Sequence, residues 1–292
     1  MNNATGPPGK GPLRFGYLRS QGLGDLAPRI LSAIVLIAAA LVSLWIGGMA
    51  FELIWFCAAL AVGYEWQNLI RAPRLRLRVL SAALSLVLVL LLSAGGFYWA
   101  ACAALSAGAA AAALVAGRGR RIWAFCGIVY AALLLTSVSV LHRPETFGIR
   151  AILWLFAIVW GTDVFAYFGG RLIGGPKLLP RVSPSKTWSG TLAGVLSGGL
   201  LGTVIGGHGL GLEAQAPLFA LGLATAAVAQ GGDILESWVK RRFGVKDSSR
   251  LIPGHGGFMD RLDGFIAAAG FAAAAGALRG HATLAAGLFE WA

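Results

Sequence analysis

The sequence predicts an all-α fold, a polytopic helix bundle embedded in a membrane. Hydrophobic residues make up 57% of the 292 residues, and the mean hydropathy of +0.74 is too high for a soluble protein of this length. The apolar residues are gathered in stretches that approach or exceed the length of about 20 residues that a helix needs to cross a bilayer. Basic residues lie mainly between alternate stretches, as expected for loops on one side of a membrane.

Nine membrane spans are predicted from these stretches. The first is too long for an ordinary signal-peptide core and is therefore expected to be retained. The predicted spans cover roughly residues 30–50, 51–70, 79–95, 98–116, 123–141, 150–170, 189–206, 216–236 and 264–279.

The distribution of Lys and Arg predicts an N-in, C-out topology. All but three of the 24 Lys and Arg residues fall on the side that would face the cytoplasm, the exceptions being Arg143, Arg150 and Arg279. The net charge of +12 is then explained by span orientation and by contact with anionic lipid headgroups. A nucleic-acid partner is not expected, because no recognition module is present.

Charged residues account for only 12% of the chain, yet they are concentrated in one stretch near its C-terminal end. Asp233, Glu236 and Ser237 have the i, i+3 and i+4 spacing that places side chains on one face of a helix. Asp260 and Asp263 repeat the i, i+3 relation where the next apolar run begins. Two helix ends can therefore offer four carboxylates to a single site.

Between these carboxylates lie several cations and the sequence PGHGG at residues 253–257. The glycines allow positive φ angles and a close approach of the backbone to a ligand. Carboxylates bind hard divalent cations, and Lys, Arg and backbone N–H groups bind phosphate oxygens, so this stretch has the groups that phosphoryl or nucleotidyl transfer needs. The alternative is a charged cytoplasmic loop whose Asp–Arg pairs lie on a solvated face.

Two features upstream fit the same chemistry. Asp163 lies inside an apolar run, where an ionised carboxylate is costly unless it is paired, hydrated or bound to a cation. The following loop contains Lys177, Ser183, Lys186 and Thr187, whose ammonium and hydroxyl groups suit phosphates. The loop lacks the glycine spacing of a Walker A motif.

Glu65 lies near the predicted cytoplasmic end of the second span. We expect it to make a structural contact within the bundle, and a position facing the site is the alternative.

The charged stretch also resembles the signature of the phosphatidate cytidylyltransferases, or CDP-diacylglycerol synthases. The resemblance covers about 27 residues, with weaker support from the Ser-Pro-x-Lys-Thr segment at 183–187 and from Asp163. Ser185, Ser189 and Gly264 depart from residues common in that family. The matching pattern is Ser237-x-x-Lys240-Arg241-x4-Lys246-Asp247-x-Ser249-x-x-Ile252-Pro253-x-His255-Gly256-Gly257-x-x-Asp260-Arg261-x-Asp263.

The resemblance implies that CTP reacts with phosphatidic acid, with Mg²⁺ as cofactor, to give CDP-diacylglycerol and pyrophosphate. It implies that Asp233 and Asp260 are the leading metal ligands, with Asp163, Glu236 and Asp263 in support. His255 is placed either as a hydrogen-bond donor near phosphate or as a structural residue. The catalytic residues that the resemblance implies are Asp233, Asp260, Asp263, Lys246, Asp247 and His255. The substrate-binding residues that it implies are Lys177, Ser183, Lys186, Thr187, Ser237, Lys240, Arg241, Gly256, Gly257 and Arg261.

Three regions follow from these assignments. Residues 1–28 are expected to form a disordered cytoplasmic tail, and residues 29–148 a scaffold of N-terminal spans. Residues 149–292 are expected to form the catalytic region, with cytoplasmic loops at 171–188 and 237–263. We expect an integral protein of a bacterial inner membrane whose site faces the cytoplasm, in contact with membrane lipid, and a homodimer is possible from the small-residue helix faces.

Two other functions fit part of the pattern. A related CTP-dependent enzyme acting on another lipid acceptor would share the metal and triphosphate residues but differ in its lipid cleft. A cation-coupled transporter would also place acids within spans. The transporter hypothesis predicts a repeated pattern in the two halves, whereas the intramembrane aspartates lie only in the second half.

Overall fold

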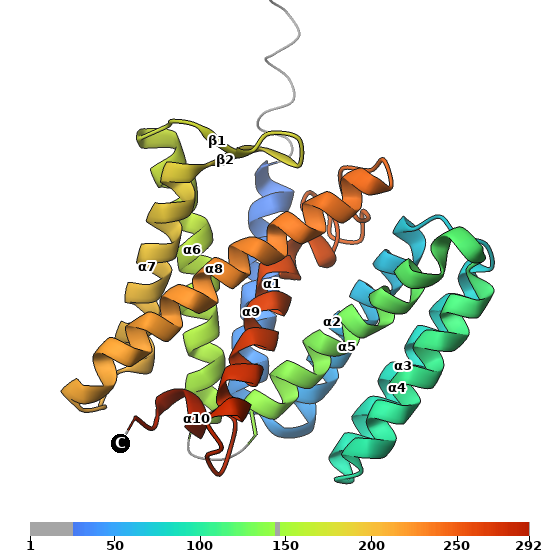
Figure 1. Cartoon of the computed structure of the whole chain (residues 1–292), viewed down its shortest axis with the longest axis horizontal. Helices are drawn as coiled ribbons and strands as arrows, with labels where there is room; N and C mark the ends of the chain where they lie inside the picture. Colours follow the sequence, from blue (N-terminus) through green and yellow to red (C-terminus); the bar gives the residue numbers. More distant parts are fainter. Residues whose placement is uncertain (1–25, 144–146, 292) are drawn as a thin grey trace, which may run out of the picture.

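The computed structural model describes residues 26–143 and 147–291, and within these ranges the chain is a bundle of long α-helices (Figure 1). A short β-hairpin and a single 3-10 turn interrupt the helices. The first half contains α1 (Leu26–Ile46), α2 (Gly48–Leu69), α3 (Leu75–Ala94), α4 (Tyr98–Val115), the 3-10 turn Arg118–Arg120 and α5 (Arg121–Leu141). The second half contains α6 (Gly148–Leu172), β1 (Lys177–Leu179), β2 (Ser183–Thr187), α7 (Trp188–Gly206), α8 (Leu212–Arg242), α9 (Met259–Leu278) and α10 (Ala286–Phe289).

The prediction of a polytopic helical membrane protein is confirmed. In the described part of the chain, eight helices, α2 to α9, are long and apolar enough to cross a membrane. The remaining long helix, α1, has a shorter apolar part, Ile30–Ile46, so the count of nine spans stays a prediction. Residues 1–25 of the predicted tail lie outside the described residues, and its last three residues, 26–28, belong to α1.

The two loops predicted around the site, 171–188 and 237–263, differ from the prediction in their structure or their bounds. Helix α8 continues past residue 236 to Arg242, and the i, i+4 ion pair between Glu236 and Lys240 supports this extension. Helix α9 begins at Met259 rather than at residue 264, with Asp260 in its first turn, where the helix dipole favours a negative charge. The connecting loop is therefore 243–258, and the loop predicted at 171–188 contains the antiparallel β1–β2 hairpin.

The connections that carry most of the basic residues lie together at one end of the bundle. Figure 1 shows the α2–α3 and α4–α5 connections, the β-hairpin and the α8–α9 loop at the upper end. The α7–α8 and α9–α10 connections lie at the opposite end. This arrangement brings the hairpin and the α8–α9 loop, which carry the predicted site residues, to the same end of the fold.

Glycines allow α6 and α7 to pack in close contact. The buried residues of α7 are all glycines, several of them four residues apart. A Cβ at Gly194 would lie 2.6 Å from the backbone oxygen of Thr162, and a Cβ at Gly190 would lie 2.6 Å from that of Ala166. The close approach holds the part of α6 that carries Asp163 against α7, directly below the hairpin.

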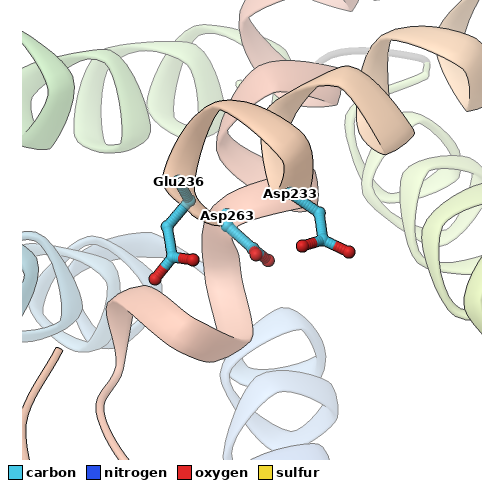
Figure 2. A group of neighbouring side chains, drawn as sticks. All are labelled: Asp233, Glu236 and Asp263. Carbon is cyan, nitrogen blue, oxygen red and sulfur yellow. The ribbon is translucent and has the colours of Figure 1, made fainter. Parts of the chain in front are cut away.

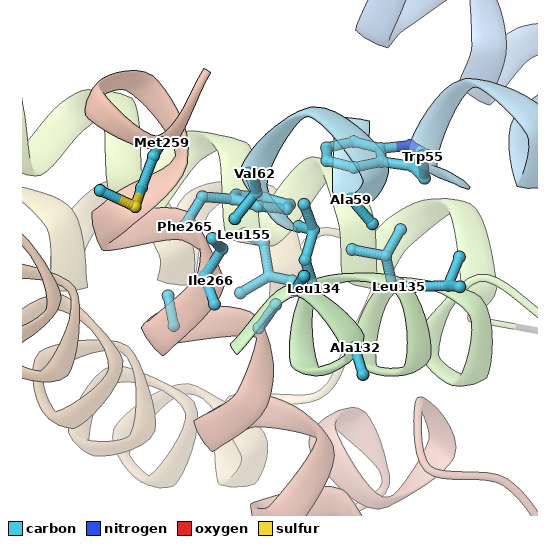
Figure 3. Close-up of a cluster of buried hydrophobic side chains, with 14 of the residues drawn as sticks. Trp55, Ala59, Val62, Ala132, Leu134, Leu135, Leu155, Met259, Phe265 and Ile266 are labelled. Atoms are coloured by element: carbon cyan, nitrogen blue, oxygen red, sulfur yellow. The ribbon is translucent and has the colours of Figure 1, made fainter. Parts of the chain in front are cut away.

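A hydrophobic core joins the N-terminal helices to those that carry the site. Its centre is a group of aromatic rings from three helices, Trp55 of α2, Phe156 of α6 and Phe265 of α9. The ring centroids of Trp55 and Phe265 are 5.1 Å apart. Leu134 and Leu135 of α5 are buried in the same cluster (Figure 3). Helices α2 and α5 of the first half of the chain therefore pack directly against α9.

Candidate active site

The β-hairpin brings Lys186 to the side of α8. Lys177 pairs with Thr187 in the hairpin register, and the Thr187 hydroxyl accepts a hydrogen bond of 3.1 Å from Gly190 N at the start of α7. Thr187, predicted to bind substrate, is thus the N-cap of α7. The strand preceding this cap directs Lys186 toward α8.

Lys186 contacts two residues one turn apart on α8. Its Nζ lies 2.6 Å from Oδ2 of Asp233 and donates a hydrogen bond of 2.6 Å to Oε1 of Gln230. The Lys186 side chain is only 16% exposed. The hairpin cation is therefore held in a fixed position beside the first of the predicted carboxylates.

Three carboxylates from two helices converge next to this ion pair. Asp233 and Glu236 of α8 and Asp263 of α9 each offer an oxygen, and these oxygens lie within 4.8 Å of one another (Figure 2). The two helices can approach closely there because residue 232 is a glycine. A Cβ at this position would lie only 2.6 Å from the Asp263 backbone oxygen. Such a set of hard oxygen ligands suits a divalent cation. We call these three residues the acidic group.

Asp260 lies outside the acidic group and has other partners. Its Oδ1 is 2.7 Å from Nζ of Lys240, and its Oδ2 accepts hydrogen bonds from the Ser248 hydroxyl at 2.9 Å and from Gly257 N at 2.8 Å. Lys240 Nζ also lies 2.6 Å from Glu236 Oε2. Lys240 therefore joins Asp260 to the acidic group through two short, largely buried ion pairs.

The α8–α9 loop folds back on itself at the predicted glycine turn. Ile252 and Gly256 form an isolated β-bridge, and Gly256 has a φ of +89°, a conformation that favours glycine. Arg261 donates to the His255 backbone oxygen from Nε at 3.1 Å and from Nη2 at 2.8 Å. The Nδ1 atom of His255 lies 2.5 Å from the Ser32 hydroxyl, so the turn also contacts α1.

Glu65 fixes the other side of this loop. Its side chain is fully buried in α2 and accepts hydrogen bonds from the Ser248 and Ser249 hydroxyls and from the backbone N–H groups of Phe258 and Met259. Glu65 thus makes buried contacts within the bundle, and its partners belong to the α8–α9 loop and to the first residue of α9.

Two cavities meet at the acidic end of the bundle. The smaller, of about 340 Å³, lies below the hairpin, and the larger, of about 950 Å³, extends along α1, α2 and α6. Asp163 and Asp233 line both cavities. The smaller cavity is also lined by Tyr167, Arg171, Lys186, Thr187 and Gln230. The larger is lined by apolar residues such as Leu36, Trp55 and Phe156, and at one end by Lys240, His255, Asp260, Arg261 and Asp263.

Several predicted residues have positions at the edge of this arrangement. The Ser237 hydroxyl is 3.4 Å from Asp233 Oδ1, and exposed Lys177 donates to the Ser185 backbone oxygen. Arg241, Lys246 and Asp247 are exposed and belong to neither cavity lining. Ser183 is paired with Leu179 at the turn of the hairpin.

Four residues near the site were not predicted as site residues. Gln230 stands three residues before Asp233 on α8, so helical spacing from that aspartate is a signal that would have found it. Tyr167 and Arg171 form a hydrogen-bonded pair on α6, four and eight residues after Asp163. Ser248, in contrast, has no distinguishing pattern around it.

Comparisons with known proteins identify the family of the chain. Residues 27–278 match the sequence model of the Cytidylyltransferase family. A protein of Brucella abortus biovar 1 named phosphatidate cytidylyltransferase is 40% identical over 252 residues, which cover 85% of this chain and 92% of that protein. Proteins of the same name from Haemophilus influenzae and Rickettsia bellii are 38% and 43% identical over 44% and 39% of this chain, and over 46% and 52% of their own lengths. The chain belongs to the Cytidylyltransferase family.

Proposed function

We propose that the protein is a nucleotidyltransferase that transfers the cytidylyl group of CTP to phosphatidate, forming CDP-diacylglycerol and pyrophosphate. The names of its relatives and the family match support this reaction. The eight apolar helices fit an enzyme whose acceptor is a membrane lipid. In the reaction, a phosphate oxygen of phosphatidate bonds to the α-phosphorus of CTP. The bond from that phosphorus to the oxygen bridging the β-phosphate breaks, and pyrophosphate leaves.

The observation that carries the proposal is the junction of the two cavities at Asp163 and Asp233. One cavity has a polar wall with Lys186 and Arg171, which suits the phosphates of a nucleotide. The other is large and mostly apolar, which suits acyl chains, and its charged end lies at the acidic group. A headgroup phosphate in the second cavity can thus meet a nucleotide phosphate in the first.

The residues around the junction match what this reaction requires. The lipid phosphate is already an anionic nucleophile, so positioning and charge neutralisation matter more than a strong general base. We assign Lys186 to phosphate oxygens on the nucleotide side and Arg261 to those on the lipid side, because each lines the corresponding cavity. Lys240, held between Glu236 and Asp260, is assigned to positioning these carboxylates.

The acidic group fits a divalent cation, and we propose Mg²⁺. Mg²⁺ is usually held by one or two carboxylates together with substrate phosphates, and Asp233 and Asp263 provide two such groups from different helices. Glu236 would hold the ion with them or fix Lys240, and Asp163 would approach from the cavity wall. When bound, the ion would neutralise phosphate charge and orient the reacting phosphates. Asp260, expected as a leading ligand, is reassigned to fixing Lys240 and the loop.

The placement in the membrane is also part of the proposal. We propose an inner-membrane protein whose hairpin and α8–α9 loop face the cytoplasm, where CTP is found, because the basic connections lie at that end. A cysteine introduced at Arg181, an exposed position in the hairpin, should react with an impermeant maleimide in inverted vesicles and not in intact spheroplasts. Labelling in spheroplasts would overturn the orientation.

The homodimer stays a prediction, to be checked by light scattering in detergent.

The proposed reaction is tested by turnover of the purified protein in detergent with phosphatidate, labelled CTP and Mg²⁺. Label should enter the lipid phase, and EDTA should abolish this transfer, with excess Mg²⁺ restoring it. Transfer to a different lipid acceptor but not to phosphatidate would keep the nucleotide site and refute the substrate. An absence of CTP use would favour the transporter hypothesis.

A further inference from the structure

We propose that Glu65 is a positioning residue for the transfer reaction, which holds the α8–α9 loop and the start of α9 in the geometry that the site requires. Glu65 belongs to α2, in the half of the chain predicted to form scaffold. The inference rests on the proposed function for its kinetic part and on the structure alone for its conformational part.

The Glu65 carboxylate is the meeting point of four donors that are distant in sequence. Oε1 accepts from the Ser249 hydroxyl at 2.6 Å and from Phe258 N at 2.9 Å. Oε2 accepts from Met259 N at 2.7 Å and from the Ser248 hydroxyl at 3.2 Å. The side chain is fully buried, where hydrogen bonds to a charged acceptor are strong and an unpaired charge would be costly.

This carboxylate also takes the place of an N-cap for α9. The first N–H groups of a helix have no partner within the helix, and Phe258, which precedes α9, provides no capping side chain. Glu65 reaches from α2 to accept the N–H of Met259, the first residue of α9. The negative charge beside the helix N-terminus is favourable by the same electrostatics as a local cap.

A short chain of contacts leads from Glu65 to the acidic group. The Ser248 hydroxyl lies between Glu65 Oε2 and Asp260 Oδ2, at 3.2 Å and 2.9 Å. Asp260 in turn holds Lys240 at 2.7 Å, and Lys240 holds Glu236 at 2.6 Å. A displaced Glu65 side chain would therefore move Ser248 and Asp260, and through Lys240 change the position of Glu236.

Gly257 packs so closely against Glu65 and Ser248 that a side chain at this position would clash with both. A Cβ on Gly257 would lie 2.6 Å from Glu65 Oε1 and would also meet the Ser248 hydroxyl. Gly257 donates its own N–H to Asp260 at 2.8 Å. Gly257 thus allows the loop backbone to pass between the carboxylates of Glu65 and Asp260.

The substitution Glu65→Gln tests the inference because it keeps the size of the side chain and changes its hydrogen bonding. The amide of Gln would point an N–H₂ group at Phe258 N or at Met259 N, so one buried backbone donor loses its acceptor. We expect amide exchange at Phe258 and Met259 to rise at least about tenfold and kcat to fall about 10- to 100-fold. The KM for CTP should change by less than about threefold, since the groups assigned to the nucleotide stay in place.

Glu52→Gln is the matched control. Glu52 lies on the same helix and contacts the Ser139 hydroxyl, and neither residue lines the two cavities. This variant should keep wild-type kcat and wild-type exchange at the start of α9. Ser248→Ala is the second test variant, because it removes the hydroxyl between Glu65 and Asp260 without touching the α9 cap, and it should also lower kcat.

If Glu65 had a purely structural role, Glu65→Gln would lower the Tm and the yield but leave kcat per folded molecule unchanged. This result would overturn the inference. If Glu65→Gln does not fold, wild-type kcat in Ser248→Ala overturns it instead. Wild-type protein that fails to use CTP would refute the proposed function. In that case the exchange measurement still decides whether Glu65 holds the loop.

Discussion

Lys186 of the β-hairpin and Asp233 of α8 form an ion pair of 2.6 Å between Nζ and Oδ2. The pair lies where the cavity below the hairpin, lined by Lys186 and Arg171, meets the larger cavity. It thus connects the element proposed to bind nucleotide phosphates with the acidic group proposed to bind the metal ion. A lysine so placed can exchange a carboxylate oxygen for a phosphate oxygen when substrate binds.

Removing the Lys186 charge should strongly reduce turnover. We expect Lys186→Met to lower kcat/KM for CTP at least about 100-fold, because a cation directed at transferring phosphates stabilises the transition state. Arg181→Met, at an exposed position in the same hairpin, is the control and should be close to wild type. Equal kinetics for the two variants would exclude Lys186 from the site.

Neutralising either of the two leading carboxylates should abolish metal-dependent turnover. Asp233→Asn and Asp263→Asn are each expected to lower kcat by about 100-fold or more, since both are proposed to hold the ion. Glu213→Gln, at the other end of α8, is the matched control. The assay should be repeated over a range of Mg²⁺ concentrations. Two variants with wild-type activity and an unchanged Mg²⁺ requirement would show that the acidic group is not the metal site.

Lys240 should matter for stability as well as activity. Lys240→Met leaves the largely buried carboxylates of Glu236 and Asp260 without their shared cation, and losing one partner of a buried pair typically costs about 3 kcal/mol. We therefore expect a clearly lower Tm by thermal unfolding in detergent. Arg242→Met, exposed two residues further along α8, should leave the Tm unchanged. A normal Tm in Lys240→Met would argue that Lys240 is held only loosely and is available to substrate.

Two glycine substitutions compare a tightly packed glycine of the α8–α9 loop with a glycine of α8 that faces open space. Gly257→Ala should lower both Tm and activity, because its Cβ would contact Glu65 and Ser248. Gly231→Ala, within α8, places a Cβ in open space and should be neutral or stabilising by up to about 1 kcal/mol, the helix propensity difference. A Gly257→Ala enzyme with wild-type Tm and kcat would mean that the loop backbone can shift without consequence.

Much of the fold was predictable because hydropathy and charge act on whole segments. The apolar stretches correctly predicted the helices from α2 to α9, and the i, i+3 spacing of Asp233 and Glu236 predicted their shared helix face. The ends of α8 and α9 were predicted less well. Charged residues can continue a helix when they form i, i+4 pairs, as Glu236 and Lys240 do.

The partners within the site could not be predicted from spacing alone. Asp260 and Asp263 are equivalent in the sequence pattern, yet tertiary contacts direct Asp263 to the acidic group and Asp260 to Lys240 and Ser248. The link from Glu65 to residues 248–259 spans more than 180 positions. Such contacts depend on how α2 packs against α9, which no local pattern encodes.

The most direct test is one assay that measures CDP-diacylglycerol and pyrophosphate together, for the wild-type protein and for Asp263→Asn, with and without Mg²⁺. The wild type should release both products in equal amounts and only with the metal, whereas Asp263→Asn should release neither above background while keeping its Tm within a few degrees. Equal, metal-dependent turnover by the two proteins would contradict the assignment of the acidic group as the centre of the reaction.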